Sequence, residues 1–165
     1  MKTKYVIIVR HGEYNAGTGS LTNQGKKDVE LLGALLLRII KDAQCGMFYC
    51  RMTPRAIETA EILNGIISPA LYESERKLFG GGNPDDWSWM QEFVNTQNEF
   101  DFLIFVTYRD FGEFFPPYYL RYKETNNLVP ERGEAVCINT NTKKCILLPN
   151  GMDQLDAFLG KKEKT

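Results

Sequence analysis

Short runs of hydrophobic residues alternate along the chain with longer segments in which hydrophobic residues recur at helical spacing. The apolar runs cover 5–9, 46–50 and 101–108, and polar residues or glycines lie at their ends. A short run that is apolar throughout is typical of a strand buried on both faces of a sheet. The pattern therefore predicts three buried strands, with a weaker extended segment over 69–75.

Two of the intervening segments carry clear helix signals. In the segment 22–43, Thr22 is a candidate N-cap in front of hydrophobic residues that are spaced by three and four positions. In the helix that follows the second run, Thr53 is the candidate cap, Pro54 suits the first helical position and Gly65 marks the end. We predict a long amphipathic helix and then a shorter one.

The second half of the chain predicts further helices. Asn83 is the candidate cap of a third helix. A fourth helix begins after the third apolar run, and the Pro116–Pro117 pair is expected to break or kink it. A short helix over 152–159 closes the chain.

The segment 133–151 alternates around a polar turn and is predicted to form a hairpin at the edge of the sheet. If its loop centres on Asn141, Cys137 and Cys145 lie directly opposite each other with their side chains on one face. The preceding order of strand, helix, strand, helix favours a parallel sheet, which places the chain in the α/β class.

The composition is that of an ordinary globular protein. The 165 residues are 43% hydrophobic and 25% charged, and the formal net charge is −1. We expect one domain over 1–160 and a solvated tail over 161–165. The absence of basic excess and of a membrane-length apolar segment argues against nucleic acid and membrane partners and favours a cytoplasmic location.

The four cysteines are Cys45, Cys50, Cys137 and Cys145, and no pair has the CxxC spacing. With one histidine in the chain, no zinc site of familiar spacing is formed. In a reducing cytosol we expect free, buried thiols.

The single histidine, His11, stands between Arg10 and Gly12 at the carboxyl end of the first predicted strand. Ligands of open α/β sheets bind in the crevice outside the carboxyl ends of the strands. A functional site is one interpretation of this placement, and a surface histidine in a loop is the other. The residues around His11 do not decide between them.

Three motifs occur in a fixed order: VRHGE at the end of the first strand, LTNQG at the start of the first helix, and TPRAIETAEIL at the start of the second. Together they resemble the histidine phosphatase superfamily, also called phosphoglycerate mutase-like proteins. The match covers about the first sixty residues. Length and the GGNPDDW helix start are similar to the small phosphohistidine phosphatases. The resemblance implies a three-layer α/β/α fold with a mostly parallel central sheet.

The resemblance also implies the chemistry of the site. His11 takes the phosphoryl group as a covalent phosphohistidine, Arg10 and Arg55 clamp the phosphoryl oxygens, and Gly12 lies at the same phosphate. A neutral imidazole is nucleophilic near pH 7 once its tautomer is fixed. Arginines bind phosphate bidentately and keep their charge, so no metal and no organic cofactor is expected.

The sequence departs from the family at one pocket position. The family carries a second histidine at the end of the strand that corresponds to 101–108, and this chain has Tyr108 there. A tyrosine can donate a hydrogen bond to phosphate, but it is neutral below its pKa near 10. Arg109 is a second candidate to restore the charge, although its side chain should begin on the opposite side of the strand.

A general acid that protonates the leaving oxygen is less well defined. Glu73 and Glu75 are the candidates, with solvated loop charges as the alternative interpretation, and Glu13 is expected to face solvent. Small phosphohistidine phosphatases lack this glutamate, because a phosphorylated nitrogen is a good leaving group.

These observations predict a phosphatase that acts through phospho-His11 on a phosphohistidine protein or a small phosphomonoester. The alternative is a weak or inactive pseudo-phosphatase that binds a phosphorylated ligand or partner, which the tyrosine at position 108 favours. The sequence does not predict an oligomeric state.

Overall fold

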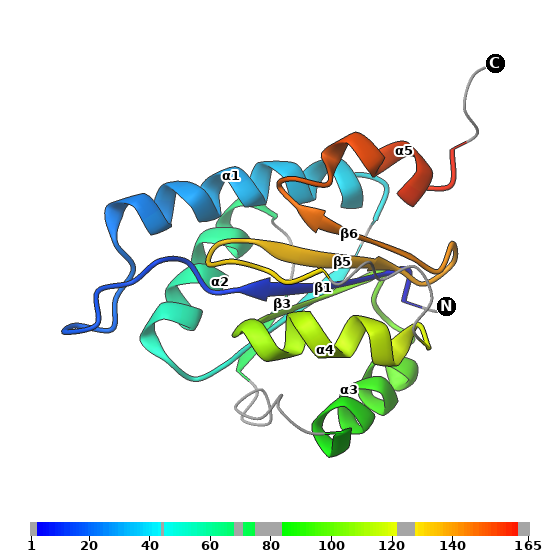
Figure 1. The fold of residues 1–165 in the computed structure, drawn as a ribbon, viewed down its shortest axis with the longest axis horizontal. Helices are drawn as coiled ribbons and strands as arrows, with labels where there is room; N and C mark the ends of the chain where they lie inside the picture. Colours follow the sequence, from blue (N-terminus) through cyan, green and yellow to red (C-terminus); the bar gives the residue numbers. More distant parts are fainter. Residues whose placement is uncertain (1–2, 44, 68–70, 75–83, 122–127, 162–165) are drawn as a thin grey trace.

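A six-stranded mixed sheet forms the centre of the computed structural model, which describes residues 3–43, 45–67, 71–74, 84–121 and 128–161 (Figure 1). The strand order across the sheet is β3-β2-β4-β1-β5-β6. β1 pairs in parallel with β4 and antiparallel with β5. The strands are β1 Tyr5–Arg10, β2 Gly46–Cys50, β3 Leu71–Ser74, β4 Phe102–Thr107, β5 Ala135–Asn139 and β6 Lys144–Leu148.

Helices cover both faces of the sheet. Figure 1 shows α1 and α5 along one side and α3 and α4 along the other. The helices are α1 Asn23–Ile40, α2 Pro54–Ile66, α3 Pro84–Thr96, α4 Arg109–Tyr119 and α5 Leu155–Phe158, with a 3₁₀ turn at Met152–Gln154. No helix among these described residues is long and apolar enough to cross a membrane.

The side chains of β1 explain why the sheet needs two helical layers. Ile7 and Val9 pack with the residues of α1, α2 and α5, whereas Val6 and Ile8 pack with those of α3 and α4. All four are fully buried, as the uninterrupted apolar run predicts. The prediction of a three-layer α/β/α fold with a mostly parallel sheet is confirmed.

The register brings the carboxyl ends of three neighbouring strands to one edge. Arg10 at the end of β1 lies opposite Thr107 at the end of β4. On the other side of β4, Cys50 at the end of β2 lies opposite Val106. The segments that follow these strands therefore begin side by side, and they include the three predicted motifs.

The predicted end of α2 is wrong, and of the predicted break or kink in α4 the break is absent. The Pro116–Pro117 pair does not break α4, which contains both prolines and ends at Tyr119. The two prolines lack the N–H groups that would donate to carbonyl oxygens one turn earlier, but the N–H of Leu120 still donates to the carbonyl oxygen of Pro116 at 2.9 Å and closes the last turn. Gly65 does not end α2, because the helix continues to Ile66. The predicted cap Asn83 lies outside the described residues.

The hairpin is present at the sheet edge, but its predicted register is wrong. Cys137 pairs with Ile146 and Cys145 pairs with Ile138, so the two cysteines lie on opposite faces of the sheet. The side-chain oxygen of Asn139 accepts hydrogen bonds from two backbone N–H groups of the loop, which sets the loop one position later. All four cysteines are free thiols; three are buried, and Cys45 is half-buried.

Candidate active site

His11 follows directly on β1 and is nearly enclosed, with 5% of its surface exposed. Its Nδ1 lies 3.0 Å from the carbonyl oxygen of Gly12, which can only accept a hydrogen bond. The proton therefore sits on Nδ1, and Nε2 carries the lone pair. The Nε–H of Arg55 donates to this Nε2 at 3.2 Å. The structure thus brings together the imidazole and the guanidinium of two separate motifs.

The surroundings of His11 keep the ring neutral. The pKa of His11 is lowered from 6.5 to about 4, chiefly by burial and also by the positive charges of Arg55, Arg10 and Arg132, against the opposing hydrogen bond to Gly12. A lone pair on a neutral imidazole is what nucleophilic attack requires. His11 holds that state throughout the neutral pH range.

This lowered pKa predicts a pH dependence of stability. The unfolded chain binds a proton at His11 near pH 6.5, whereas the folded chain binds it near pH 4. The stability associated with neutral His11 is therefore fully present above pH 6.5 and is lost as the pH falls towards 4, by about 3 kcal/mol in total. The measurement is urea unfolding of wild type and His11→Asn from pH 7.5 to 4 in a buffer without oxyanions. A difference between the two free energies that stays constant with pH would contradict the prediction.

Hydrogen bonds of one threonine link the start of α2 to the loop that contains His11 and Gly12. Thr59 is fully buried, its Oγ1 accepts from the N–H of Gly12 at 3.1 Å, and its hydroxyl donates to the carbonyl oxygen of Arg55 at 2.7 Å. These bonds fix Arg55, the second residue of α2, relative to His11. They also occupy the N–H of Gly12. Gly12 therefore serves the site through its carbonyl oxygen and through close packing rather than by donating to an anion.

The LTNQG motif holds the same loop from the α1 side. The hydroxyl of Thr22 accepts from the N–H of Gly25 at 3.0 Å, which is the predicted N-cap bond. A Cβ on Gly25 would collide with the backbone of Glu13, so only glycine allows this approach. Glu13 is exposed, as predicted, and its carboxylate accepts from the Thr22 hydroxyl.

Arg10 turns its side chain across the same edge of the sheet. Its Nη1 donates to the carbonyl oxygen of Pro130 at 3.2 Å and lies 3.6 Å from the carboxylate of Glu131. Its Nε is buried and has no hydrogen-bond partner among the described residues. A buried donor of this kind is costly unless an acceptor is bound, which makes the position suited to an oxyanion.

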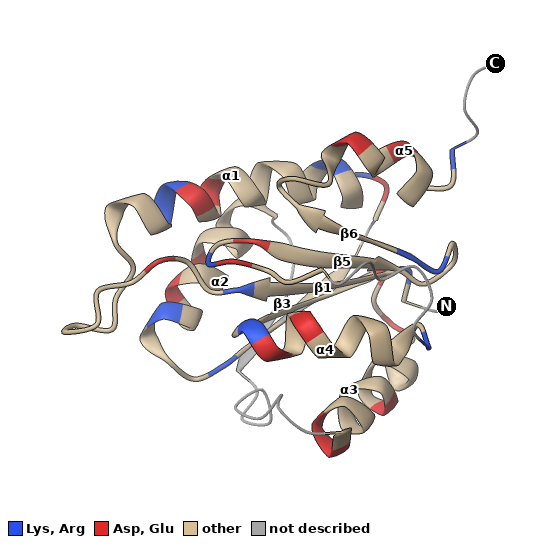
Figure 2. Cartoon of the chain, viewed as in Figure 1, with Lys and Arg blue, Asp and Glu red and all other residues tan. Residues whose placement is uncertain are grey.

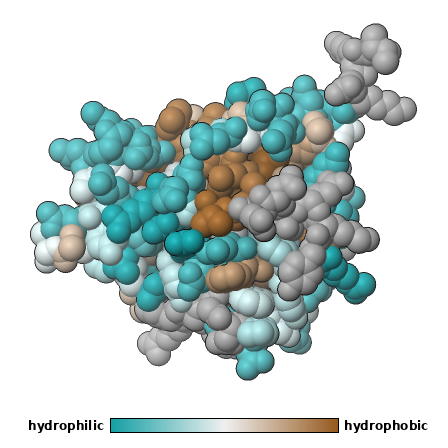
Figure 3. Space-filling view, viewed as in Figure 1, coloured by the Kyte–Doolittle hydropathy of each residue, from teal (hydrophilic) through white to brown (hydrophobic). Residues whose placement is uncertain are grey.

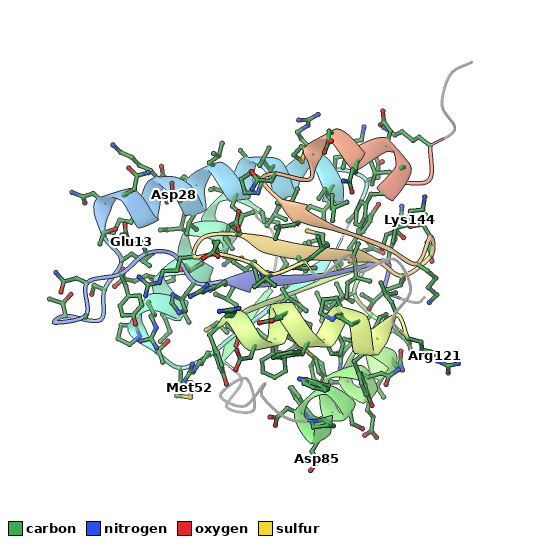
Figure 4. All side chains as sticks on the ribbon, in the orientation of Figure 1. Glu13, Asp28, Met52, Asp85, Arg121 and Lys144 are labelled. Carbon is green, nitrogen blue, oxygen red and sulfur yellow. The ribbon has the colours of Figure 1, made fainter. Side chains whose placement is uncertain are left out.

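An open cavity of about 530 Å³ lies beside Arg10 and is lined by Arg10, Arg132 and three acidic residues, Glu13, Asp28 and Glu131. Figure 2 shows blue segments at the end of β1 and at the starts of α2 and α4, with red segments close to them on the same side of the molecule. In Figure 4, the labelled Glu13 and Met52 flank this side, while Lys144 and Arg121 lie at the far end. Basic side chains thus gather where the parallel strands end, with acidic side chains among them.

Comparison with known proteins identifies the architecture. No protein-family model and no curated protein matches the sequence. Among solved structures, the phosphoglycerate mutase of Plasmodium falciparum is 18% identical, with 89% of each chain covered and a TM-score of 0.58. The protein histidine phosphatase SixA in complex with tungstate is 15% identical, with 87% of this chain and 93% of that chain covered and a TM-score of 0.60. A protein described as the phosphohistidine phosphatase SixA of Agrobacterium tumefaciens is 10% identical, covers 88% and 96%, and has a TM-score of 0.66.

The chain has the histidine phosphatase fold. At these identities the likeness concerns the fold, and it agrees with the superfamily to which the three motifs point. The roles of individual residues rest on the geometry of this chain.

Tyr108, which the sequence resemblance aligns with a second pocket histidine, follows β4 and directly precedes α4. The guanidinium of Arg51 lies over its ring, 4.4 Å from the centroid, and Phe111 packs against it edge-on. Burial raises the pKa of the Tyr108 phenol, so the residue is neutral at physiological pH. Arg109 pairs with Glu113 on its own helix at 3.1 Å, and the structure does not bring it to His11.

The structure describes one of the two candidate general acids. Glu73 is a residue of β3, where its backbone lies opposite Tyr49, as the weaker extended segment over 69–75 predicts and unlike the alternative of a loop position. Glu75 lies outside the described residues. Among the residues that are described, no three or more side chains of His, Cys, Asp or Glu gather into a possible metal site.

Sequence reasoning missed four residues near the site. Thr59 was visible only as part of a motif, and Arg51 and Arg132 were single arginines without a pattern. The ring of Tyr14 contacts His11 edge-on, with centroids 5.3 Å apart. The proximity of these four residues to the site depends on segments that come together only in the folded chain.

Proposed function

We propose that this protein is a phosphatase that transfers the phosphoryl group of its substrate to Nε2 of His11 and then to water. The observation that carries the proposal is the contact between the Nε2 lone pair and Arg55, on a buried imidazole with its proton on Nδ1. A nucleophile and a phosphate-binding cation face the same point. An incoming phosphoryl oxygen would take over the Arg55 donor and leave the lone pair directed at phosphorus.

In the first step the bond between Nε2 and phosphorus forms as the bond from phosphorus to the leaving group breaks. Phosphoryl transfer requires positioning and positive charge opposite the oxygens rather than covalent chemistry from other groups. Arg10 and Arg55 supply both. In the second step water attacks phosphorus, phosphate leaves, and the imidazole returns to its starting form.

The leaving group determines whether a general acid is needed. An alkoxide requires a proton, for which Glu73 and Glu75 are the candidates, whereas the nitrogen of a phosphohistidine leaves more readily. We therefore propose a phosphohistidine protein or a small phosphomonoester as the substrate. The solved neighbours support this range, because they include a protein histidine phosphatase and a mycobacterial glucosyl-3-phosphoglycerate phosphatase.

One observation favours a second candidate function. The neutral Tyr108 at the position of the second histidine weakens the charge of the pocket, which suits a pseudo-phosphatase that binds a phosphorylated ligand without turnover. Arg51 above its ring gives that position a structural role as well. Substitution of Tyr108 distinguishes the phosphatase from the pseudo-phosphatase.

Tyr108→His is expected to raise kcat/KM for an aryl phosphate about tenfold or more. The reason is that one charge-assisted contact to the transition state is worth on the order of 1.5 to 3 kcal/mol. The measurement is a pair of kcat/KM values at matched pH. Tyr108→Phe is the matched control, because it keeps a ring under Arg51 and adds no charge.

If Tyr108 belongs to a site built for binding alone, both variants should stay at background turnover while phosphate still binds. That result, together with an inactive wild type, would exclude the phosphatase and leave the binding protein. Wild-type turnover that disappears in His11→Ala would exclude the pure pseudo-phosphatase.

A further inference from the structure

We propose that Arg132 is the third guanidinium of the oxyanion pocket, held in place by the ring of Tyr14, and that it supplies the positive charge that Tyr108 does not. This inference deepens the proposed function and rests on it. It assigns a phosphate-binding role to a loop that none of the three motifs includes.

The loop that carries Arg132 is bound directly to the backbone of the nucleophile. The N–H of Gly133 donates to the carbonyl oxygens of Arg10 at 3.2 Å and of His11 at 3.1 Å, and the N–H of Arg10 donates to Glu134 at 3.0 Å. Gly133 adopts a φ of +77°, which favours glycine. The position of Arg132 beside His11 is therefore set by the main chain.

The side chain of Arg132 is directed to the site by an aromatic contact. Its guanidinium lies 4.9 Å from the centroid of the Tyr14 ring, and that of Arg55 lies 4.5 Å from the same centroid. The ring edge contacts His11. Because a guanidinium is attracted to an aromatic face, one tyrosine holds two cations beside the nucleophile.

The charges around Arg132 leave its guanidinium available for an anion. Glu131 pairs with Arg10, and Glu134 accepts from the backbone N–H of Glu131. Asp28 lines both neighbouring cavities together with Arg132, and its carboxylate accepts from the side chain of Gln24. Among the described residues, Arg132 forms no ion pair within 4.0 Å. Its charge lowers the pKa of both His11 and Arg10, which shows that it acts on the same small volume.

Several cations held together around a neutral imidazole repel one another unless an anion lies among them. The charge of Arg109 also lowers the pKa of Arg10, but its guanidinium is paired with Glu113 on its own helix. Arg132 also lines the open cavity next to Arg10. It is exposed, so it stands at the mouth of the pocket, where it can contact an outward-facing phosphoryl oxygen.

The same residue borders a second cavity of about 210 Å³, whose lining includes Leu31, Leu32 and Pro149. Figure 3 shows an apolar area in the middle of this face, between α1 and the β5–β6 hairpin. Asp28, Glu131 and Glu134 line this cavity as well. Arg132 therefore stands between the His11 site and a recess that is partly apolar and partly acidic. This placement is consistent with a contact to the phosphoryl group of a bound substrate.

The test measures binding of inorganic phosphate by calorimetry in the His11→Asn background, in which phosphoryl transfer to residue 11 is absent. Adding Arg132→Gln is expected to raise the Kd for phosphate about tenfold, and more at low than at high salt. Arg132→Lys, which keeps the charge, should recover part of the loss. Arg38→Gln removes the same charge at the far end of α1 and should leave the Kd unchanged.

A second pair of variants tests whether Arg132 replaces the missing histidine charge. Tyr108→His added to Arg132→Gln is expected to restore most of the phosphate affinity at pH 6.5. Tyr14→Leu combined with Arg132→Gln should show less than the sum of the two single losses, because Tyr14 acts on phosphate partly through Arg132.

Unchanged phosphate affinity in Arg132→Gln would overturn the proposal, and so would the absence of any recovery on adding Tyr108→His. These outcomes are independent of the phosphatase proposal, which fails instead if wild-type His11 is never phosphorylated. Circular dichroism of each variant establishes that the compared proteins are folded. If Arg132→Gln does not fold, Arg132→Lys is compared with the parent His11→Asn protein instead. Equal Kd values for phosphate in these two proteins would contradict the proposal.

Discussion

Replacing His11 by asparagine is expected to lower kcat/KM for an aryl phosphate by at least about a thousandfold, because the chain loses the group that forms the covalent intermediate. His11 is the only histidine of the sequence. No other imidazole can therefore accept the phosphoryl group. The measurement is steady-state hydrolysis of the aryl phosphate near pH 7, with wild type and variant purified in parallel.

Phosphate affinity is the control for this variant. Arg10, Arg55 and Arg132 remain in place in His11→Asn, so the Kd for phosphate should stay within a few-fold of the wild-type value. Loss of turnover with retained binding identifies a chemical role for His11. Hydrolysis by His11→Asn at more than a tenth of the wild-type rate would show that the reaction does not pass through this residue.

Replacing Arg55 by glutamine is expected to lower kcat/KM about a hundredfold. Arg55 combines a donor directed at Nε2 of His11 with a permanent charge at the start of α2, and a charge-assisted contact of this kind is worth on the order of 1.5 to 3 kcal/mol. The change also removes one of the charges that lower the pKa of His11, so that pKa should rise. Steady-state kinetics and titration of the histidine ring by NMR measure the two effects.

Two comparisons make the Arg55 result specific. Arg55→Lys keeps the charge but lacks the planar fork, so it should recover only part of the activity. Arg38→Gln makes the same substitution at an exposed position on α1 and should behave as wild type. Full activity in Arg55→Gln would remove the basis for placing the phosphoryl group between Arg55 and His11.

The buried parts of the fold could be predicted from the sequence because their patterns are dictated locally. The run 46–50 coincides with β2, and the Thr22 cap makes the predicted hydrogen bond to Gly25. Both depend on neighbours within a few positions. The three-layer arrangement follows as well, since a strand that is apolar throughout has to be covered on both faces.

Two local patterns gave wrong predictions because a side-chain hydrogen bond decides one of them and the position of a helix end decides the other. The register of the hairpin depends on Asn139, whose side chain binds the loop backbone and moves the turn by one position. A one-residue shift sends Cys145 to the other face of the sheet. The effect of the proline pair depends on how near the end of α4 it lies, which the sequence did not show.

The candidate site was partly visible in the sequence. Arg10, His11 and Arg55 could be named from three motifs, and the geometry brings them together. Arg132 and Tyr14 could not be named, because neither residue belongs to a motif or to a periodic pattern. The backbone bonds from Gly133 to Arg10 and His11 create their proximity, and these exist only in the folded protein.

The most direct test of the account is detection of the phosphorylated intermediate. Wild-type protein mixed with a small phosphodonor and quenched over time should show an acid-labile, alkali-stable phosphoryl group on Nε2 of His11. Its formation and decay should be at least as fast as steady-state turnover, and His11→Asn should show none. Turnover of the phosphodonor without phosphorylation of His11, or with the phosphoryl group on another residue, would contradict the account.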